Sequence, residues 1–481
     1  MTIVILFINI YLKKRKKKKL VKVMNLKSIF APVDMTEGSP VRQIVKFTIP
    51  MLLGNIAQQL YNTADSIIVG RFVGDNALAA VGSAGPILNL MLVLFMGIAV
   101  GASIMVSQYF GAKQREHLSK AIGCSITLTA IASLIIMIMG PIITRPILEL
   151  LGTPESIIDW CTVYLWIIFI GILGGGFYNI MSGILRGLGD SVSALIYLLV
   201  ATSLNIALDL LFVATFRMGV AGVALATVLA QFVSAFLCMR KLTKMSDVFD
   251  MKKEYLIPEK FYTMNLIKLG LPSGVTQAIF SMSMIVVQNL TNTFGELYIA
   301  ANVIVMRVDG FVMLPAFSFG SAMTTFAGQN IGAGKIDRVE KGAKSGTLAA
   351  MGISAVLSVL IIIFGKYIMG IFTSTHELIE MSYKMMCILI VGYIAMEVTQ
   401  CLSGIMRGAG DTVAPMWISM FSSIIMRVPM AYIFVNLTKS PELPQGNCYM
   451  MQLSMLITWT LGAFITFLTY KVGRWKTKAI T

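Results

Sequence analysis

The stretch SGILRGLGD occupies residues 182–190 of this 481-residue chain, and SGIMRGAGD occupies residues 403–411. The two stretches differ only at apolar positions and share one Gly, Arg, Gly, Gly, Asp spacing. A polar pattern that occurs twice indicates an internal repeat, and a repeat changes how every other segment is interpreted.

The same offset recurs elsewhere in the chain. The two stretches are 221 residues apart (403 − 182 = 221), and so are Gln108 in SQYFGAK and Gln329 in GQNIGAGK (329 − 108 = 221). Gly74 and Gly295, each in a turn that leads toward an Ala-Ala pair, keep the same register (295 − 74 = 221). Three matches in one register predict a protein made of two equivalent halves.

The composition is that of a membrane protein. The chain is 57% hydrophobic and 13% charged, with a mean hydropathy of +0.80, whereas soluble domains are about 25% charged. A helix needs about 20 apolar residues to cross a bilayer. Stretches of that length lie near 45–70, 79–107, 121–143, 161–185, 192–214, 219–239, 266–294, 300–327, 345–365, 382–406, 413–437 and 451–471. The sequence therefore predicts an all-α integral membrane protein with twelve transmembrane helices.

Six helices in each half return the chain to the side from which it started. The halves are therefore expected to be parallel repeats, with a substrate site near the membrane midplane and transport by rocking of one half against the other. We assign 35–240 and 266–473 to the two six-helix halves, 241–265 to a cytoplasmic linker and 474–481 to a cytoplasmic tail. Residues 1–34, which include KKRKKKK, are expected to form a disordered basic extension.

The net charge of +16 reflects orientation in the membrane. Of the 39 Lys and Arg residues, 31 fall in segments on one side of the predicted helices and 6 on the other. This is the bias that the positive-inside rule produces. It predicts a multi-pass plasma-membrane protein with both termini in the cytoplasm, and it disfavours nucleic acid as a partner.

The sequence contains few of the motifs expected of an enzyme or a metal site. The six cysteines include no CxxC pair and the chain has two histidines, so the usual patterns of a zinc site are missing from the sequence. No phosphate-binding GxxxxGK[ST] motif or nucleophile with a histidine base occurs. We expect neither enzyme activity nor a resident cofactor.

Polar residues inside membrane helices are candidate functional residues because they are costly there. In the first half they recur at i, i+3, i+4 or i+7 and so share helix faces: Gln58, Asn62 and Asp65; Thr202, Asn205 and Asp209; Thr227 and Gln231. Asp65 and Asp209 have no basic residue within the membrane in their half. We expect these acids to bind and release a proton.

The second half has a different charge pattern. Its intramembrane acids, Asp309 and Glu397, are matched in number by Arg307 and Arg427. Ion pairing would neutralise them, which favours a structural or gating role and leaves Asp309, Glu397 and Arg427 as reserve coupling residues.

The repeated stretches are expected to end two helices at the cytoplasmic face. There Arg186 and Asp190, and likewise Arg407 and Asp411, can close an ion pair or cap the next helix. We interpret these four residues as hinge or gate residues.

A ligand-binding cavity is harder to place from sequence. The 34 methionines and 10% aromatic residues suit a polarizable surface that repacks around different ligands. Six mid-helix residues are weaker candidates for its lining: Gln59, Asn62, Asn179, Gln277, Met284 and Gln288.

The motifs QQLYNTADSIIVG, GILRGLGDS, GQNIGAGK and GIMRGAGDT, in this order, resemble those of the multidrug and toxic compound extrusion family. The resemblance runs from about Glu37 to Gly473. It implies a V-shaped, twelve-helix antiporter in the lipid bilayer that exports organic cations and drugs in exchange for protons or sodium. The resemblance also implies that Asp65, Asn205, Asp209 and Thr227 fall where archaeal and bacterial members have a first-half cation site. We expect the protein to be a monomer.

Three alternatives remain at this stage. A lipid-linked oligosaccharide flippase of the same superfamily needs several inward cations for its pyrophosphate, and only Arg307 and Arg427 lie at depth. A lipid-modifying membrane enzyme lacks its catalytic motif, and a passive channel does not need two equivalent halves.

The charge bias predicts which loops face outward. Single cysteines at Ser156 and Asp247, placed in a cysteine-free background, should react with an impermeant maleimide from outside and inside the cell respectively. Labelling of the Ser156 position from the inside only would overturn the predicted topology.

Overall fold

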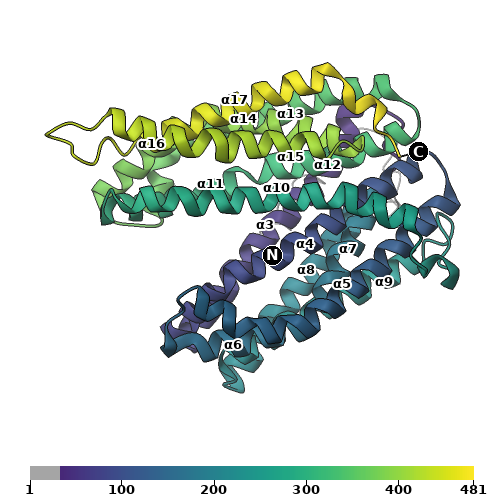
Figure 1. The fold of residues 1–481 in the computed structure, drawn as a ribbon, viewed down its shortest axis with the longest axis horizontal. Helices are drawn as coiled ribbons and strands as arrows, with labels where there is room; N and C mark the ends of the chain where they lie inside the picture. The colour runs from purple at the N-terminus through teal and green to yellow at the C-terminus, as the bar shows by residue number, and fades with distance from the viewer. Residues whose placement is uncertain (1–32, 481) are drawn as a thin grey trace, which may run out of the picture. The chain divides into compact units, whose positions relative to one another are not determined.

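The computed structural model describes residues 33–480, and their regular structure is helical, with one isolated bridge between Ser440 and Leu443 (Figure 1). The basic extension expected over 1–34 lies almost wholly outside the described residues. Continuous helices suit a bilayer because they satisfy every backbone N–H and C=O internally, where no water is present to do so.

The helices follow one another as two sets of six spans. The first set is α3 (Pro40–Phe72), α4 (Asp75–Gly111), α5 (Arg115–Leu150), α6 (Glu155–Ile170) with α7 (Ile172–Gly187), α8 (Ser191–Asp209) with the π-helical turn η1 (Leu210–Thr215), and α9 (Gly219–Thr243). The second set is α10 (Lys260–Asn292), α11 (Glu296–Val312) with α12 (Leu314–Gly332), α13 (Ile336–Gly370), α14 (His376–Gly408), α15 (Val413–Met420) with the π-helical turn η3 (Phe421–Met426) and α16 (Arg427–Leu437), and α17 (Met450–Val472).

The number of spans agrees with the sequence. Ten spans in the described part of the chain are long and apolar enough to cross a membrane, and the pair α6 and α7, bent by 53°, makes an eleventh. The twelfth is α3, whose 33 residues include Gln58, Gln59, Asn62 and Asp65 and are therefore less apolar. The predicted fold class is confirmed.

The two sets of spans contact each other through equivalent helices. Helix α10 packs against α4, and α3 packs against α12 and α13 (Figure 1). Glycines permit these close approaches: a Cβ added to Gly101 would lie 2.8 Å from the Leu266 oxygen, and one added to Gly97 would lie 2.9 Å from the Gly270 oxygen. Small residues commonly line such helix contacts in membranes because they let backbones come close.

The repeated stretches form the turns after α7 and α14. Gly189 (φ +87°) and Gly410 (φ +99°) adopt left-handed conformations that favour glycine. The earlier glycines of each stretch press their helix against a neighbour: a Cβ on Gly183 would lie 2.7 Å from the Ala99 oxygen, and one on Gly404 would lie 2.3 Å from the Gly320 oxygen. The repeat thus encodes both a turn and a close helix contact.

This contact can be tested with one methyl group. Gly404→Ala should destabilise the protein by about 1–3 kcal/mol, the usual cost of overpacking, because α12 and α14 must separate. Gly352→Ala is the matched control, since a Cβ there meets nothing within 4 Å. Thermal unfolding followed by tryptophan fluorescence measures both variants, and equal melting temperatures would contradict the close packing.

Candidate functional site

Two acids meet inside the first half. Asp65 lies on α3 and Asp209 is the last residue of α8, where the chain passes into the π-helical turn η1. Such turns occur frequently at functional sites. The carboxyl groups of Asp65 and Asp209 lie close enough to interact with each other. The structure therefore brings together the two acids that sequence reasoning singled out.

Three more polar residues complete this group. The Asn205 amide, with its nitrogen turned toward the acid, donates to Asp209 Oδ2 at 2.9 Å and accepts from the Thr227 N–H at 3.2 Å. Tyr61, on α3, lies with its hydroxyl 3.3 Å from Thr227 Oγ1. We call Tyr61, Asp65, Asn205, Asp209 and Thr227 the first-half polar cluster.

Two carboxylate oxygens of the cluster accept no hydrogen bond. The Oδ1 atoms of Asp65 and Asp209 are buried without a hydrogen-bond partner, as is Thr202 Oγ1 nearby in sequence on α8. The ion pairs found within residues 33–480 involve neither acid. Buried polar atoms are normally satisfied, so free carboxylate oxygens here indicate a place where a cation can bind.

Other polar candidates from the sequence have recorded contacts with residues outside the cluster. Gln58 donates to Asn62 at 3.4 Å, one turn along the same helix. Gln231 instead lies against α7, where its Oε1 is 2.6 Å from a Cβ placed on Gly175. Asn179 of α7 donates to the Gly175 carbonyl, so its side chain satisfies its own helix.

The second half does not form the ion pairs that the sequence suggested. Arg307 is exposed, because residues two apart on a helix face different directions and Asp309 turns inward. Asp309 accepts a hydrogen bond from Tyr393 and lies near Arg427 without a direct ion pair. Glu397 on α14 is 1% exposed and its Oε2 atom has no partner. The expectation of neutralising ion pairs for these acids was therefore wrong.

Of the four hinge or gate residues, the two aspartates cap the next helix and do not pair with the arginine of their own stretch. Asp190 accepts from the Ser193 N–H at 2.9 Å and from the Ser193 hydroxyl at 2.7 Å, at the start of α8. Its charge partner is Lys241 of α9 at 3.4 Å, whereas Arg186 donates to Ser182. Asp411 repeats the cap by accepting from the Ala414 N–H. For Arg407, as for Arg186, the structure records no pairing with the aspartate of its own stretch.

The candidate cavity residues lie on three helices. Gln59 and Asn62 are on α3, Asn179 is on α7, and Gln277, Met284 and Gln288 are on α10. Asn62, Gln277 and Met284 are exposed. A polar side chain that is exposed on a membrane helix usually faces water or a partner rather than lipid.

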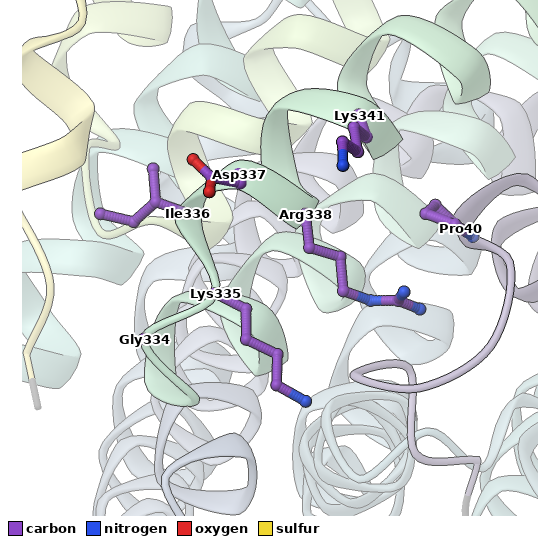
Figure 2. Close-up of a pocket in the computed structure, with 7 residues that line it drawn as sticks. All are labelled: Pro40, Gly334, Lys335, Ile336, Asp337, Arg338 and Lys341. Carbon is purple, nitrogen blue, oxygen red and sulfur yellow. The ribbon is translucent and has the colours of Figure 1, made fainter.

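A cavity of about 540 Å³ lies elsewhere, at the turn between α12 and α13. Figure 2 shows the side chains of Lys335, Arg338 and Lys341 around it, beside Pro40 at the start of α3. Three basic side chains against Asp337 alone repel a cationic ligand, so this cavity is unsuited to an organic cation.

Comparison with known proteins settles the family. The family model MatE matches the chain twice, over 50–211 in the first half and 272–433 in the second. The chain belongs to the MatE family. The members of this family, multidrug and toxic compound extrusion proteins, are transporters and not enzymes.

Relatives of this MatE protein span nearly its whole length. It is 32% identical to the probable multidrug resistance protein YoeA of Bacillus subtilis, over 83% of this chain and 88% of the relative. It is 31% identical to YpnP, a probable multidrug resistance protein of the same organism, over 92% and 97%. A solved MATE-family multidrug resistance transporter in an outward-facing conformation is 25% identical and superposes with a TM-score of 0.85, covering 95% of this chain and 98% of that one.

Sequence reasoning missed two tyrosines near the acids. Tyr61 lies four residues before Asp65, so helical spacing alone was enough to find it. Tyr164 on α6 is buried and lies near enough to Asp65 and Asp209 for their charges to act on its hydroxyl. No sequence pattern linked Tyr164 to them, since only tertiary packing brings α6 to this place.

The cap at Asp190 has a measurable role in this MatE protein. Asp190→Ala should lower the free energy of unfolding by about 1–2 kcal/mol, the usual cost of losing an N-cap, whereas Asp190→Asn keeps a side-chain oxygen for the Ser193 N–H and should lose less. Thermal unfolding measures the difference. Equal losses in the two variants would show that charge pairing with Lys241, not the cap, is what Asp190 contributes.

Proposed function

We propose that this protein is a secondary antiporter that exports organic cations in exchange for protons or sodium ions, and that Asp65 and Asp209 bind the exchanged ion. The observation that carries this proposal is that two carboxyl groups, Asp65 partly buried and Asp209 fully buried, lie close together with no basic partner in the described structure. A buried acid of this kind requires a cation to bind it, because an isolated charge is costly there.

The geometry favours a proton as that cation. Two adjacent ionised carboxylates are both acceptors and repel each other, whereas a proton on one of them lets the pair form a hydrogen bond. Asn205 donates to Asp209, and Asp65 retains a free oxygen. Sodium is the alternative ion, because it binds carboxylate and hydroxyl oxygens, and the cluster holds two carboxyls and the Thr227 hydroxyl.

Coupling then follows from competition. If an organic cation and the exchanged ion favour opposite charge states or opposite openings of the transporter, each lowers the affinity for the other by the same factor. The ion that enters thereby releases the drug that leaves. Mutual exclusion needs no direct contact between the two sites, only two conformations with different affinities.

The drug path is assigned to exposed residues, two amides and a methionine, on the two helices that begin the halves. Asn62 on α3 and Gln277 and Met284 on α10 are exposed. Gln59 approaches Gly310 of the other half, since its Nε2 lies 3.3 Å from the point that a Cβ on Gly310 would occupy. We also include Gln288 of α10 and Asn179 of α7 in the proposed lining. Uncharged amides and a thioether suit amphipathic cations without demanding one shape.

The remaining assignments also belong to this proposal. Positive-inside charge bias supports a plasma-membrane protein with both termini in the cytoplasm. Arg186, Asp190, Arg407 and Asp411 act as hinge or gate residues at that face, and the protein works as a monomer. Asp309, Glu397 and Arg427 are the reserve coupling residues, with Glu397 favoured among them by its unpaired oxygen.

The acids can be tested by removing charge without changing size. Asp209→Asn and Asp65→Asn should each reduce ethidium export by at least about tenfold, since an amide cannot exchange a proton and one lost interaction of about 1.4 kcal/mol is already tenfold. Asp159→Asn, at an exposed ion pair with Arg145, is the matched control and should export normally. Full export by folded Asp209→Asn protein would assign that residue a purely structural role.

The exchanged ion needs its own experiment. Ethidium efflux from proteoliposomes, driven in turn by a proton gradient and by a sodium gradient, should respond to the proton gradient in the wild type and to neither in Asp209→Asn. Efflux driven by the sodium gradient alone would identify sodium, rather than the proton, as the ion bound at this site. Efflux that needs neither gradient would contradict antiport.

A further inference from the structure

Two buried glutamines bridge the halves at equivalent positions of the repeat. Gln329 donates to the Gly187 carbonyl at 3.1 Å and accepts from the Met35 N–H at 2.9 Å. Gln108 donates to the Gly408 carbonyl at 2.8 Å and accepts from the Ile480 N–H at 2.8 Å. Both side chains are completely buried. Each amide thus bonds two backbone groups, and those groups are equivalent in the two halves.

Each glutamine reaches into the opposite half. Gln108 belongs to α4, but its partners end α14 and follow α17; Gln329 belongs to α12, but its partners end α7 and precede α3. The partner segments also lie on the repeated turns. The Val33 N–H donates to the Gly189 carbonyl, and the Lys478 oxygen would lie 2.3 Å from a Cβ on Gly410.

We call residues 33–36 and 478–480 the two straps. Each strap lies on the repeated turn of its own half, and the glutamine of the other half enters between strap and turn. Arg338 and Lys335 of the second half add donors to the carbonyls of the N-terminal strap, including Met35 and Thr36. The halves are therefore joined at this end by the ends of the described chain as well as by helices.

The backbones themselves touch at the same level. A Cβ on Gly111 would lie 1.9 Å from the Gln329 oxygen, and a Cβ on Gly332 would lie 1.9 Å from the Gln108 oxygen. Ser107 faces Gly328 across the contact, with its Oγ 1.9 Å from the Cβ position. Solute cannot pass between α4 and α12 where their backbones are in contact, so this end of the transporter is closed.

We propose that Gln108, Gln329 and the two straps form a latch that closes this end and opens once in every transport cycle. Rocking requires the halves to separate here, and each amide then exchanges its backbone partners for water. Such an exchange is nearly balanced, because a neutral hydrogen bond contributes little net free energy. Neutral amides therefore hold the end closed without trapping it, which buried ion pairs would do less readily.

Labelling of a cysteine at the contact reports the opening. In a background without the six native cysteines, Ser107→Cys serves as reporter, since Ser107 is fully buried against the other half. An impermeant maleimide is applied to inside-out vesicles. Gln108→Ala with Gln329→Ala should raise the labelling rate by about tenfold or more, because the backbone partners of both amides would be left buried and unpaired in the closed state. Removal of residues 478–481 should raise it by a smaller factor.

Two controls make the result decisive. Gln114→Ala changes an exposed glutamine of the same end and should leave labelling unchanged. Ser125→Cys, buried within the first half, should stay protected in every variant. Unchanged labelling at position 107 in the double variant, or equal labelling at position 125, would overturn the latch. The assay uses no drug or ion gradient, so its failure would leave the coupling proposal intact.

Discussion

The contact between the backbones of α4 and α12 is the constraint on which the arrangement of the halves depends. Gly111 and Gly332 have no side chain to keep these helices apart, and each meets the backbone of a glutamine in the other half. Between lipid-immersed helices the hydrophobic effect supplies little attraction, so close packing and hydrogen bonds must hold them together. Any larger residue at either glycine would move both halves, and with them the repeated turns.

The two halves share their packing residues but differ in the charged residues of their interiors. Equivalent glycines, turns and glutamines occur in both halves, but the polar interiors differ. In the first half two carboxyl groups face each other without a basic partner in the described structure, whereas in the second half Asp309 is bonded to Tyr393 and lies near Arg427. This division fits a transporter in which both halves move and one of them carries the coupling ion.

Much of the fold was predictable because apolar length and repeat register are local properties of the sequence. Helical spacing also placed Asp65, Asn205, Asp209 and Thr227 on facing surfaces, and the structure brings these four residues together.

The paired charges were not predictable. Lys241, rather than Arg186, reaches Asp190 because α9 packs beside the turn, and no spacing within the repeated stretch reveals that. The role of the two glutamines was not predictable for the same reason. Gln108 bonds segments about 300 or more residues away, and a single sequence does not reveal which distant backbone groups a glutamine contacts.

The central claim is that the Asp65 and Asp209 pair gives up a cation when an organic cation binds. Calorimetric titration of ethidium into purified protein, in two buffers with different ionisation enthalpies, counts the protons released on binding. We expect about one proton released per drug by the wild type and none by Asp209→Asn, as reciprocal linkage requires. Tight binding to the wild type with no proton release and no dependence on sodium would contradict the claim.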